Sequence, residues 1–207
     1  MSHHKIEIQD LCFTYPDGRR AIRDASFSIY HGESVGIIGA NGAGKSTLLM
    51  LLMGILQADT GEINIGDMRL TKKTIPLIRR RIGLVFQDPD DQLFMTTVGE
   101  DVAFGPRNLG LTEDEVEERV AAALAQVGIL HLASRAPSRL SGGEKRAAAI
   151  ASVLSLRPDI LIMDEPTASL DPKSRRRVMT LLRDVMGTGL LTTSRGVSWT
   201  LGFLTTL

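Results

Sequence analysis

The sequence has 207 residues, 43% of them hydrophobic and 23% charged, a composition typical of a globular protein rather than a disordered one. Basic and acidic residues number 24 each, so no overall charge favours nucleic acid or an anionic membrane as a general partner. The longest apolar runs, 48–56 and 147–156, reach about half of the roughly 20 residues that a membrane-spanning helix needs. Cys12 is the single cysteine and no signal-peptide pattern is present, so we expect a cytoplasmic protein.

The first elements predict an antiparallel hairpin. Residues 6–15 and 25–30 partly alternate between apolar and polar side chains, and Pro16-Asp17-Gly18 between them is typical of a turn. A short apolar strand, 34–38, then leads into a glycine-rich loop, and a helix is predicted over 46–56, ending near Gly54. Two more strands are expected at 62–65 and 82–86.

The second half begins with a helical segment. Helix signals replace strand signals over about 88–155, and Thr112 with Glu115 forms a capping box that starts one helix. A fully apolar strand at 160–163 and a basic helix at 172–185 follow. We therefore predict an α/β fold with a mixed, mainly parallel core lobe, an antiparallel β subdomain and an inserted helical lobe.

The glycine-rich loop carries the strongest functional signal. Residues 39–46 fit the pattern G-x-x-x-x-G-K-[ST], in which backbone N–H groups and a helix N-terminus surround phosphate oxygens. The strand before the loop and the helix after it argue against a chance glycine-rich turn. Lys45 would reach the β- and γ-phosphates of ATP, and Ser46 would bind Mg²⁺. The loop residues assigned to the nucleotide are Gly39, Asn41, Gly42, Ala43, Gly44, Lys45, Ser46 and Thr47.

Two carboxylates follow the strand at 160–163. We expect Asp164 and Glu165 at the exposed end of a buried strand, where open parallel sheets bind ligands. Asp164 would hold the magnesium ion through its hydration shell, and Glu165 would act as the base that polarises the attacking water. A solvated strand end is the alternative, but the phosphate loop favours the catalytic interpretation.

A second anion site is predicted in the helical segment. Ser141 and Glu144 form another capping box, and Gly142 and Gly143 leave the backbone amides of the first helical turn accessible. One nucleotide does not obviously reach both this helix and the phosphate loop within one compact chain.

The order of these motifs resembles that of the ATP-binding-cassette (ABC) family over roughly residues 5–185. The matching features are the phosphate loop, Gln87, Leu140-Ser141-Gly142-Gly143-Glu144, Asp164-Glu165 and Ser169-Leu170-Asp171. This resemblance implies a P-loop NTPase of ABC type with a nucleotide-binding core at 5–87 and 156–185 and a helical signature lobe at 88–155. It also implies that two chains pair head to tail. Each ATP would then lie between one chain's phosphate loop and residues 141–143, the signature segment, of the other chain.

The resemblance assigns roles to three further residues. Gln87 would contact the magnesium ion and the attacking water while it senses a membrane partner. Asp171 would lie at the dimer seam, and Tyr15 would stack its ring against adenine, with a core tyrosine as the alternative.

The segment after Gln87, residues 88–94, is similar to that of energy-coupling-factor and cobalt or nickel uptake ATPases. There it helps to shape the groove for a coupling helix of the transmembrane subunit; a plain acidic turn is the alternative. The resemblance implies an ATPase that energises a micronutrient importer from the cytoplasmic face of the membrane. Its expected partners are transmembrane subunits and a second ABC ATPase, in a homodimer or a heterodimer, without nucleic acid.

The carboxyl end departs from the family pattern. The family has a histidine at the end of the next strand, whereas here Ser194 or Arg195 occupies that position and no histidine follows Asp164. Residues 196–207 resemble nothing in the family, and we expect an atypical C-terminal tail at 186–207, remodelled, truncated or shifted in reading frame. Hydrolysis is therefore in doubt, and a regulatory or defunct subunit that binds nucleotide is one alternative. A soluble ABC ATPase acting on ribosomes or DNA is the other.

Overall fold

A computed structural model describes residues 4–168, 170–185, 189–194 and 203–204, with side chains from 6–168 and 170–182. The described residues form two compact units. Unit 1 contains those up to Ile82, residues 159–164 and the described part of 187–207, and unit 2 contains those within 83–158 and 165–186. No helix among the described residues is long and apolar enough to cross a membrane. The domain bounds given above stay a prediction.

An antiparallel sheet with the strand order β2-β1-β4-β5 forms one layer of unit 1. Its strands are β1 (His4–Thr14), β2 (Arg20–Tyr30), β4 (Thr60–Ile65) and β5 (Met68–Arg69). The predicted hairpin of β1 and β2 is confirmed, but β2 begins earlier than expected. Asp10 and Asp24 adopt left-handed backbone angles (φ 50° and 49°) near shifts in register, and these irregularities interrupt the alternation that a sequence reading relies on.

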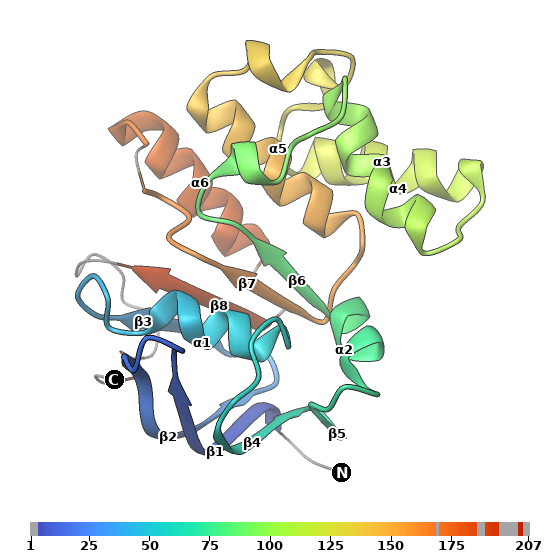
Figure 1. Cartoon of the computed structure of the whole chain (residues 1–207). Coiled ribbons are helices and arrows are strands. Elements are labelled where there is room, and N and C mark those ends of the chain that lie inside the picture. The colour runs from blue at the N-terminus through green and yellow to red at the C-terminus, as the bar shows by residue number, and fades with distance from the viewer. Residues whose placement is uncertain (1–3, 169, 186–188, 195–202, 205–207) are drawn as a thin grey trace. The chain divides into compact units, whose positions relative to one another are not determined.

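A parallel sheet brings distant parts of the chain together in unit 1 (Figure 1). Its strands in this unit follow the order β7-β8-β3-β9, and each neighbouring pair is parallel. They are β3 (Ser34–Ile38), β7 (Ile160–Met163), β8 (Gly189–Ser194) and β9 (Phe203–Leu204). Strand β6 (Ile82–Val85) crosses from unit 1 into unit 2.

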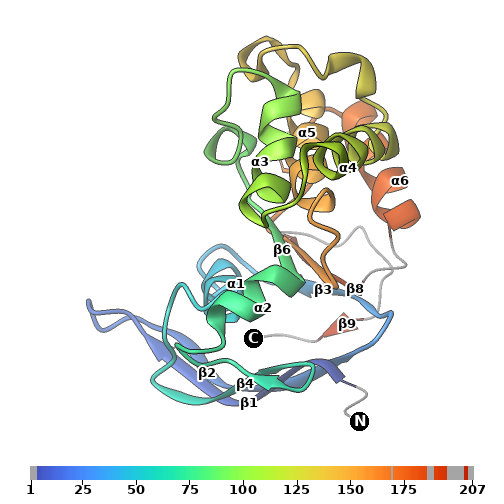
Figure 2. The same cartoon turned by 90° about the vertical axis from the view of Figure 1, so that its right-hand side faces the viewer.

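Helices α1 (Lys45–Leu52) and α2 (Ile75–Arg81) lie over the antiparallel sheet (Figure 2). Helix α1 is shorter than predicted because Gly54 adopts a left-handed conformation (φ 62°) and the Ile55 amide bonds to the Met50 carbonyl. The side chains of Leu48, Leu49, Leu51 and Leu52 are buried and anchor the helix that follows the phosphate loop.

Unit 2 is built around one buried helix. Its helices are α3 (Val98–Asn108), α4 (Glu113–Gln126), α5 (Gly142–Leu154) and α6 (Pro172–Val185), with short 3-10 turns at Pro89–Asp91, Leu130–Leu132 and Pro137–Arg139. Helix α5 contacts the other three, and its residues 147–151 are buried. The small alanine side chains on α5 let its neighbours approach closely. The predicted fold class is confirmed.

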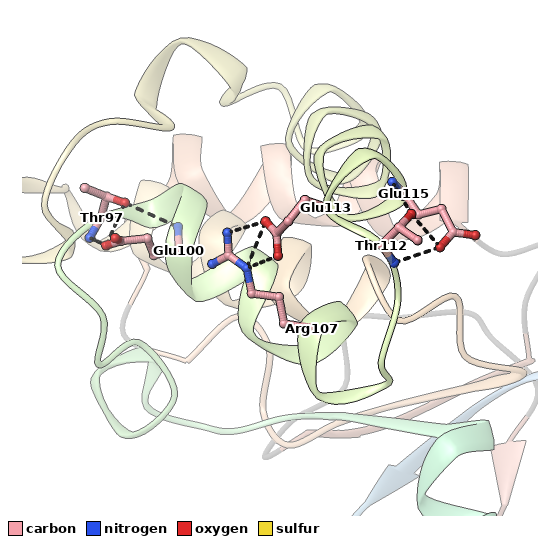
Figure 3. Close-up of polar contacts among 6 residues, drawn as sticks. All are labelled: Thr97, Glu100, Arg107, Thr112, Glu113 and Glu115. Carbon is pink, nitrogen blue, oxygen red and sulfur yellow. Dashed lines mark hydrogen bonds and ion pairs between the residues drawn. The ribbon is translucent and has the colours of Figure 1, made fainter.

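Capping boxes fix the starts of two helices in unit 2 (Figure 3). In α4, the Thr112 hydroxyl accepts from the Glu115 amide, and the Glu115 carboxylate accepts from the Thr112 amide at 2.9 Å. Thr97 and Glu100 repeat this arrangement in α3. An exposed ion pair between Arg107 and Glu113 also links the two helices, although pairs of this kind contribute little to stability.

The glycine before α1 allows a test of the loop's backbone. Gly44 has φ 90°, and a Cβ atom there would lie 2.3 Å from the Ala21 carbonyl oxygen. We expect Gly44→Ala to lower the free energy of unfolding by roughly 2–5 kcal/mol, because backbone strain and a steric clash add. Gly110→Ala is the matched control, since Gly110 has φ 78° without a neighbour within 4 Å. Urea unfolding checks both variants, and equal losses would contradict the predicted clash.

The α4 cap predicts an effect on stability and its dependence on pH. Thr112→Ala should lower the free energy of unfolding by about 1 kcal/mol, whereas Thr180→Ala, an exposed mid-helix control, should change it little. Bonds from the Thr112 amide and hydroxyl lower the pKa of Glu115 below its ordinary 4.5. The contribution of this carboxylate is therefore present above pH 4.5 and is lost as the pH falls through the lowered pKa. A difference in urea midpoint between wild type and Thr112→Ala that stays the same at all pH values would refute this role of the Glu115 titration.

Candidate functional site

The phosphate loop encloses the side chain of its own lysine. Lys45 is 5% exposed, and its Nζ donates to the carbonyl oxygens of Gly39 and Ala40 at 2.9 and 3.0 Å. The first turn of α1 has no side-chain cap, because Gly44 occupies the N-cap position, and no acidic residue lies in that turn. Backbone amides at a helix start lack intrahelical acceptors. The loop therefore combines a buried cation with amide donors, which is the chemistry that binds phosphate.

Tyr15 lies beside the same helix start. Its hydroxyl is 2.9 Å from Thr47 Oγ1, and Thr47 is largely buried. The Arg19 guanidinium lies over the Tyr15 ring, 4.6 Å from the centroid, and Phe13 contacts the ring edge at 4.9 Å between centroids. One ring face is thus covered by a cation. The structure brings the predicted Tyr15 and Thr47 into contact with each other.

Strand β8 lies between the strand that precedes the phosphate loop and the strand that precedes the predicted metal ligand, Asp164. β8 pairs in parallel with β3, where Ile38 is opposite Ser194, and with β7, where Met163 is opposite Thr192. The carboxyl ends of β3 and β7 therefore lie at the same edge of the sheet, one strand apart. Gly39 begins the phosphate loop after β3, and the half-buried Asp164 follows β7. Arg195, our other candidate for the histidine position, lies outside the described residues.

Glu165 differs from its predicted environment. The carboxylates were expected at an exposed strand end, but Glu165 is only 8% exposed, so that expectation is wrong for this residue. The chain turns sharply there, with φ 45° at Glu165 and a bond from the Ala168 amide to its carbonyl. Gln87 Nε2 lies 3.5 Å from Glu165 Oε2 within unit 2, a long contact that brings the two predicted catalytic residues together.

The signature segment and Asp171 line one cavity in unit 2. The predicted capping box is confirmed, because Ser141 accepts from the Glu144 amide and the Glu144 carboxylate accepts from the Ser141 amide at 2.7 Å. A cavity of about 240 Å³ is lined by Ser141, Gly143, Asp171 and neighbours that include Lys173 and Arg177. Bonds from the Ser174 hydroxyl and nearby backbone amides lower the pKa of Asp171, which therefore stays ionised near neutral pH.

Sequence reasoning missed a buried cation on α5. Arg146 is 2% exposed and donates to the carbonyl oxygens of Phe86 and Gln87 at 2.7 and 2.5 Å. The available signal was its spacing: Arg146 precedes the buried Ala149 and Ile150 by three and four residues, which places it on the apolar face of the helix. A cation at such a position needs specific acceptors, because burial of an unsatisfied charge is costly.

The predicted site residues are divided between the two units. Unit 1 holds Tyr15, the phosphate loop with Gly42 and Thr47, and Asp164, whereas unit 2 holds Gln87, Glu165, residues 141–143 and Asp171. The boundary passes between Asp164 and Glu165. Among the described residues, no group of three or more His, Cys, Asp or Glu side chains forms a metal site.

Known proteins are similar to this chain in sequence and in fold. The sequence model of the family described as "ABC transporter" matches residues 22–168. A Geobacter sulfurreducens protein named "Putative ABC transporter ATP-binding protein GSU1281" is 60% identical over 93% of this chain and 77% of its own length. The "Energy-coupling factor transporter ATP-binding protein EcfA" of Methanothermobacter thermautotrophicus is 50% identical over 89% of this chain, which spans 60% of that protein.

A solved structure matches the chain as well. It is CbiO1 from Clostridium perfringens, described as part of the ABC transporter complex CbiONQ, with a TM-score of 0.87 and 39% sequence identity. The match covers 94% of this chain and 80% of that chain. The family match and these relatives agree with the phosphate-binding geometry of the loop. The chain belongs to the ABC transporter family, as one of its ATP-binding ATPase subunits.

Proposed function

We propose that this chain binds ATP with Mg²⁺ and hydrolyses it to energise a membrane importer of cobalt, nickel or a related micronutrient. The observation that carries the proposal is the shared sheet edge, where parallel strands bring the phosphate loop and Asp164 one strand apart. The names of two relatives, an energy-coupling factor transporter protein and a part of the CbiONQ complex, support the importer.

The phosphate loop would hold the nucleotide. The amides of the loop and of the first turn of α1 would donate to the β- and γ-phosphates, assisted by the helix dipole. Lys45 would exchange its bonds to Gly39 and Ala40 for bonds to phosphate oxygens. Since Arg19 covers one face of the Tyr15 ring, adenine would stack on the opposite face.

The magnesium site would combine groups from several segments. Ser46 would supply a hydroxyl oxygen, Asp164 a carboxylate and Gln87 an amide oxygen, a set of hard oxygen ligands that suits Mg²⁺ bound together with phosphates. The ion would neutralise charge that develops on the phosphate oxygens. Such a site needs no cluster of carboxylate or histidine side chains, because Mg²⁺ keeps several water ligands and binds the phosphates of the nucleotide.

Glu165 would act as the general base. In the proposed reaction, a water oxygen forms a bond to the γ-phosphorus, the bond to the β–γ bridging oxygen breaks, and ADP leaves with that electron pair. Glu165 accepts the proton that the water loses, and Gln87, at 3.5 Å from its carboxylate, orients the water. The burial of Glu165 supports this role because a dry site strengthens such interactions.

A second chain would complete each nucleotide site. The N-terminus of α5 at Ser141, Gly142 and Gly143 presents donors suited to the γ-phosphate of ATP held by the partner. The cavity that these residues share with Asp171 supports a common seam in a head-to-tail homodimer or heterodimer. Such an assembly, bound to transmembrane subunits, would lie at the cytoplasmic face of the membrane.

A second candidate function is nucleotide binding without turnover. Ser194 ends β8, the strand that separates the phosphate loop from Asp164, and the family places its γ-phosphate-contacting histidine at such a strand end. A regulatory or defunct subunit would keep the binding loop and lose this contact. The loss of one charge-stabilising donor lowers rates by roughly 10²–10³.

Steady-state kinetics test the proposed reaction. Glu165→Gln should lower kcat for ATP hydrolysis by roughly 10²–10⁴, because the general base is lost, with ATP binding retained. Lys45→Ala should instead weaken ATP binding by roughly 10- to 100-fold, because a charge-assisted contact is lost. Lys72→Ala, an exposed lysine away from the loop, serves as the matched control. A wild-type rate equal to that of Glu165→Gln would overturn hydrolysis and favour the regulatory subunit.

Exposed aromatic side chains predict where the membrane partner binds. Phe94 is 64% exposed and contacts Phe104, itself 41% exposed, edge to face at 4.9 Å between ring centroids. We expect Phe94→Ser to abolish co-purification with the transmembrane subunits and to leave basal ATP hydrolysis unchanged, since an exposed aromatic anchor is removed. Leu130→Ser, at 49% exposure in the same unit, is the control. Co-purification of Phe94→Ser with the transmembrane subunits at the wild-type level would contradict this docking surface. Co-purification of the chain with ribosomes alone would contradict the importer itself.

A further inference from the structure

Arg146 fixes the backbone on both sides of Gln87. Nη1 donates to the Phe86 carbonyl at 2.7 Å, and Nη2 donates to the Gln87 carbonyl at 2.5 Å. These two carbonyls belong to the peptide planes that precede and follow the Gln87 Cα atom. Two bonds from one planar guanidinium therefore restrict φ and ψ of Gln87, and with them the direction of its Cα–Cβ bond.

A second side chain, Gln92, also binds this segment. Gln92 Oε1 accepts from the Phe86 amide at 3.1 Å, and Gln92 Nε2 donates to the Ala149 carbonyl and the Ser152 hydroxyl. The amide and the carbonyl of Phe86 are thus both bound by side chains that also belong to or contact α5. A movement of the backbone at Gln87 would therefore strain or break bonds to α5.

The burial of Arg146 is costly for the fold. The side chain is 2% exposed, its Nε has no hydrogen-bond partner, and burial lowers the pKa of the guanidinium, an effect that the charge of Asp88 partly offsets. Arginine still stays protonated at neutral pH. Neutral carbonyls compensate a buried charge less well than a carboxylate does. Stability alone therefore does not account for a cation here, whereas positioning of Gln87 does.

We propose that Arg146 is a positioning residue that sets the Gln87 side chain for the reaction at Glu165, coupling the orientation of this amide to the signature helix α5. The inference rests on the proposed function and deepens it. Gln87 Nε2 is 3.5 Å from Glu165 Oε2, so a small rotation of the Gln87 backbone moves its amide out of reach of the water and the carboxylate. Lysine is shorter and offers one ammonium nitrogen in place of the two guanidinium nitrogens, so it would not hold both carbonyls in the same geometry.

The main experiment is a double-mutant cycle of Arg146→Lys and Gln87→Ala in the full chain. We expect Arg146→Lys to lower kcat by roughly 10- to 100-fold, with little change in KM for ATP, because misplacement by about 1 Å has such effects. In the Gln87→Ala background the same change should have almost no further effect, because the group it positions is gone. Equal effects in both backgrounds would refute the inference.

The matched control is Arg119→Lys. Arg119 also donates to two successive backbone carbonyls, those of Ser155 and Leu156, in the same unit but away from Gln87. It should leave kcat unchanged. A loss in Arg119→Lys equal to that in Arg146→Lys would show a general loosening of the helical unit and would overturn the positioning role.

A readout without turnover separates this inference from the proposed function. In Glu165→Gln protein with ATP, electron paramagnetic resonance of free Mn²⁺ measures metal affinity. Arg146→Lys should weaken Mn²⁺ binding as Gln87→Ala does, while Arg119→Lys should not. Normal Mn²⁺ binding in Arg146→Lys would overturn the inference and leave the proposed function intact. Failure of the parent protein to bind ATP and Mn²⁺ would overturn the proposed function, and the role of Arg146 with it.

Discussion

The parallel pairing of β8 with β3 on one side and β7 on the other is the constraint on which the nucleotide site depends. Parallel strands run in one direction, so the segments that follow them emerge at one edge of the sheet. The phosphate loop after β3 and Asp164 after β7 are far apart in the sequence, yet this pairing brings them to that edge. The buried apolar side chains of β7, and those of α1 after the phosphate loop, anchor both segments in the core.

In unit 2, helix α5 has the corresponding role. Its small buried side chains let α3, α4 and α6 pack against it, while its N-terminus presents Ser141 and Gly143 beside Asp171. A Cβ atom at Gly143 would lie 2.6 Å from the Ser174 hydroxyl oxygen, so a side chain at this position would push α6 away. The same helix extends Arg146 to the backbone of Gln87. One element therefore joins the signature segment to the proposed catalytic amide.

Three charged residues are buried at functional positions, and their surroundings differ. Lys45 uses the carbonyls of the loop that it would leave on binding phosphate, whereas Arg146 uses carbonyls that stay in place. Glu165 is buried in a left-handed backbone conformation that costs roughly 1–3 kcal/mol for a residue with a side chain. Burial and strain of this kind are typical of sites whose geometry is set by chemistry rather than by stability.

Local patterns in the sequence were sufficient for the phosphate loop, the caps at Thr112 and Ser141, and strands 34–38 and 160–163, because these features depend on neighbouring residues. The capping box of Thr97 and Glu100 has the same pattern and could have been predicted. The left-handed turns at Asp10 and Asp24 could not, because long-range strand pairing imposes them. For that reason the full length of β2 was missed.

By itself, the sequence determined that this chain holds a phosphate-binding loop and two helix N-termini, since hydrogen bonds between near neighbours define both. Only the tertiary structure decided that Glu165 is buried, that Arg146 holds Gln87, and that β8 separates the loop from Asp164. Those features depend on which distant segments pack against and hydrogen-bond to one another. These contacts form in three dimensions, and no spacing along the chain encodes them directly.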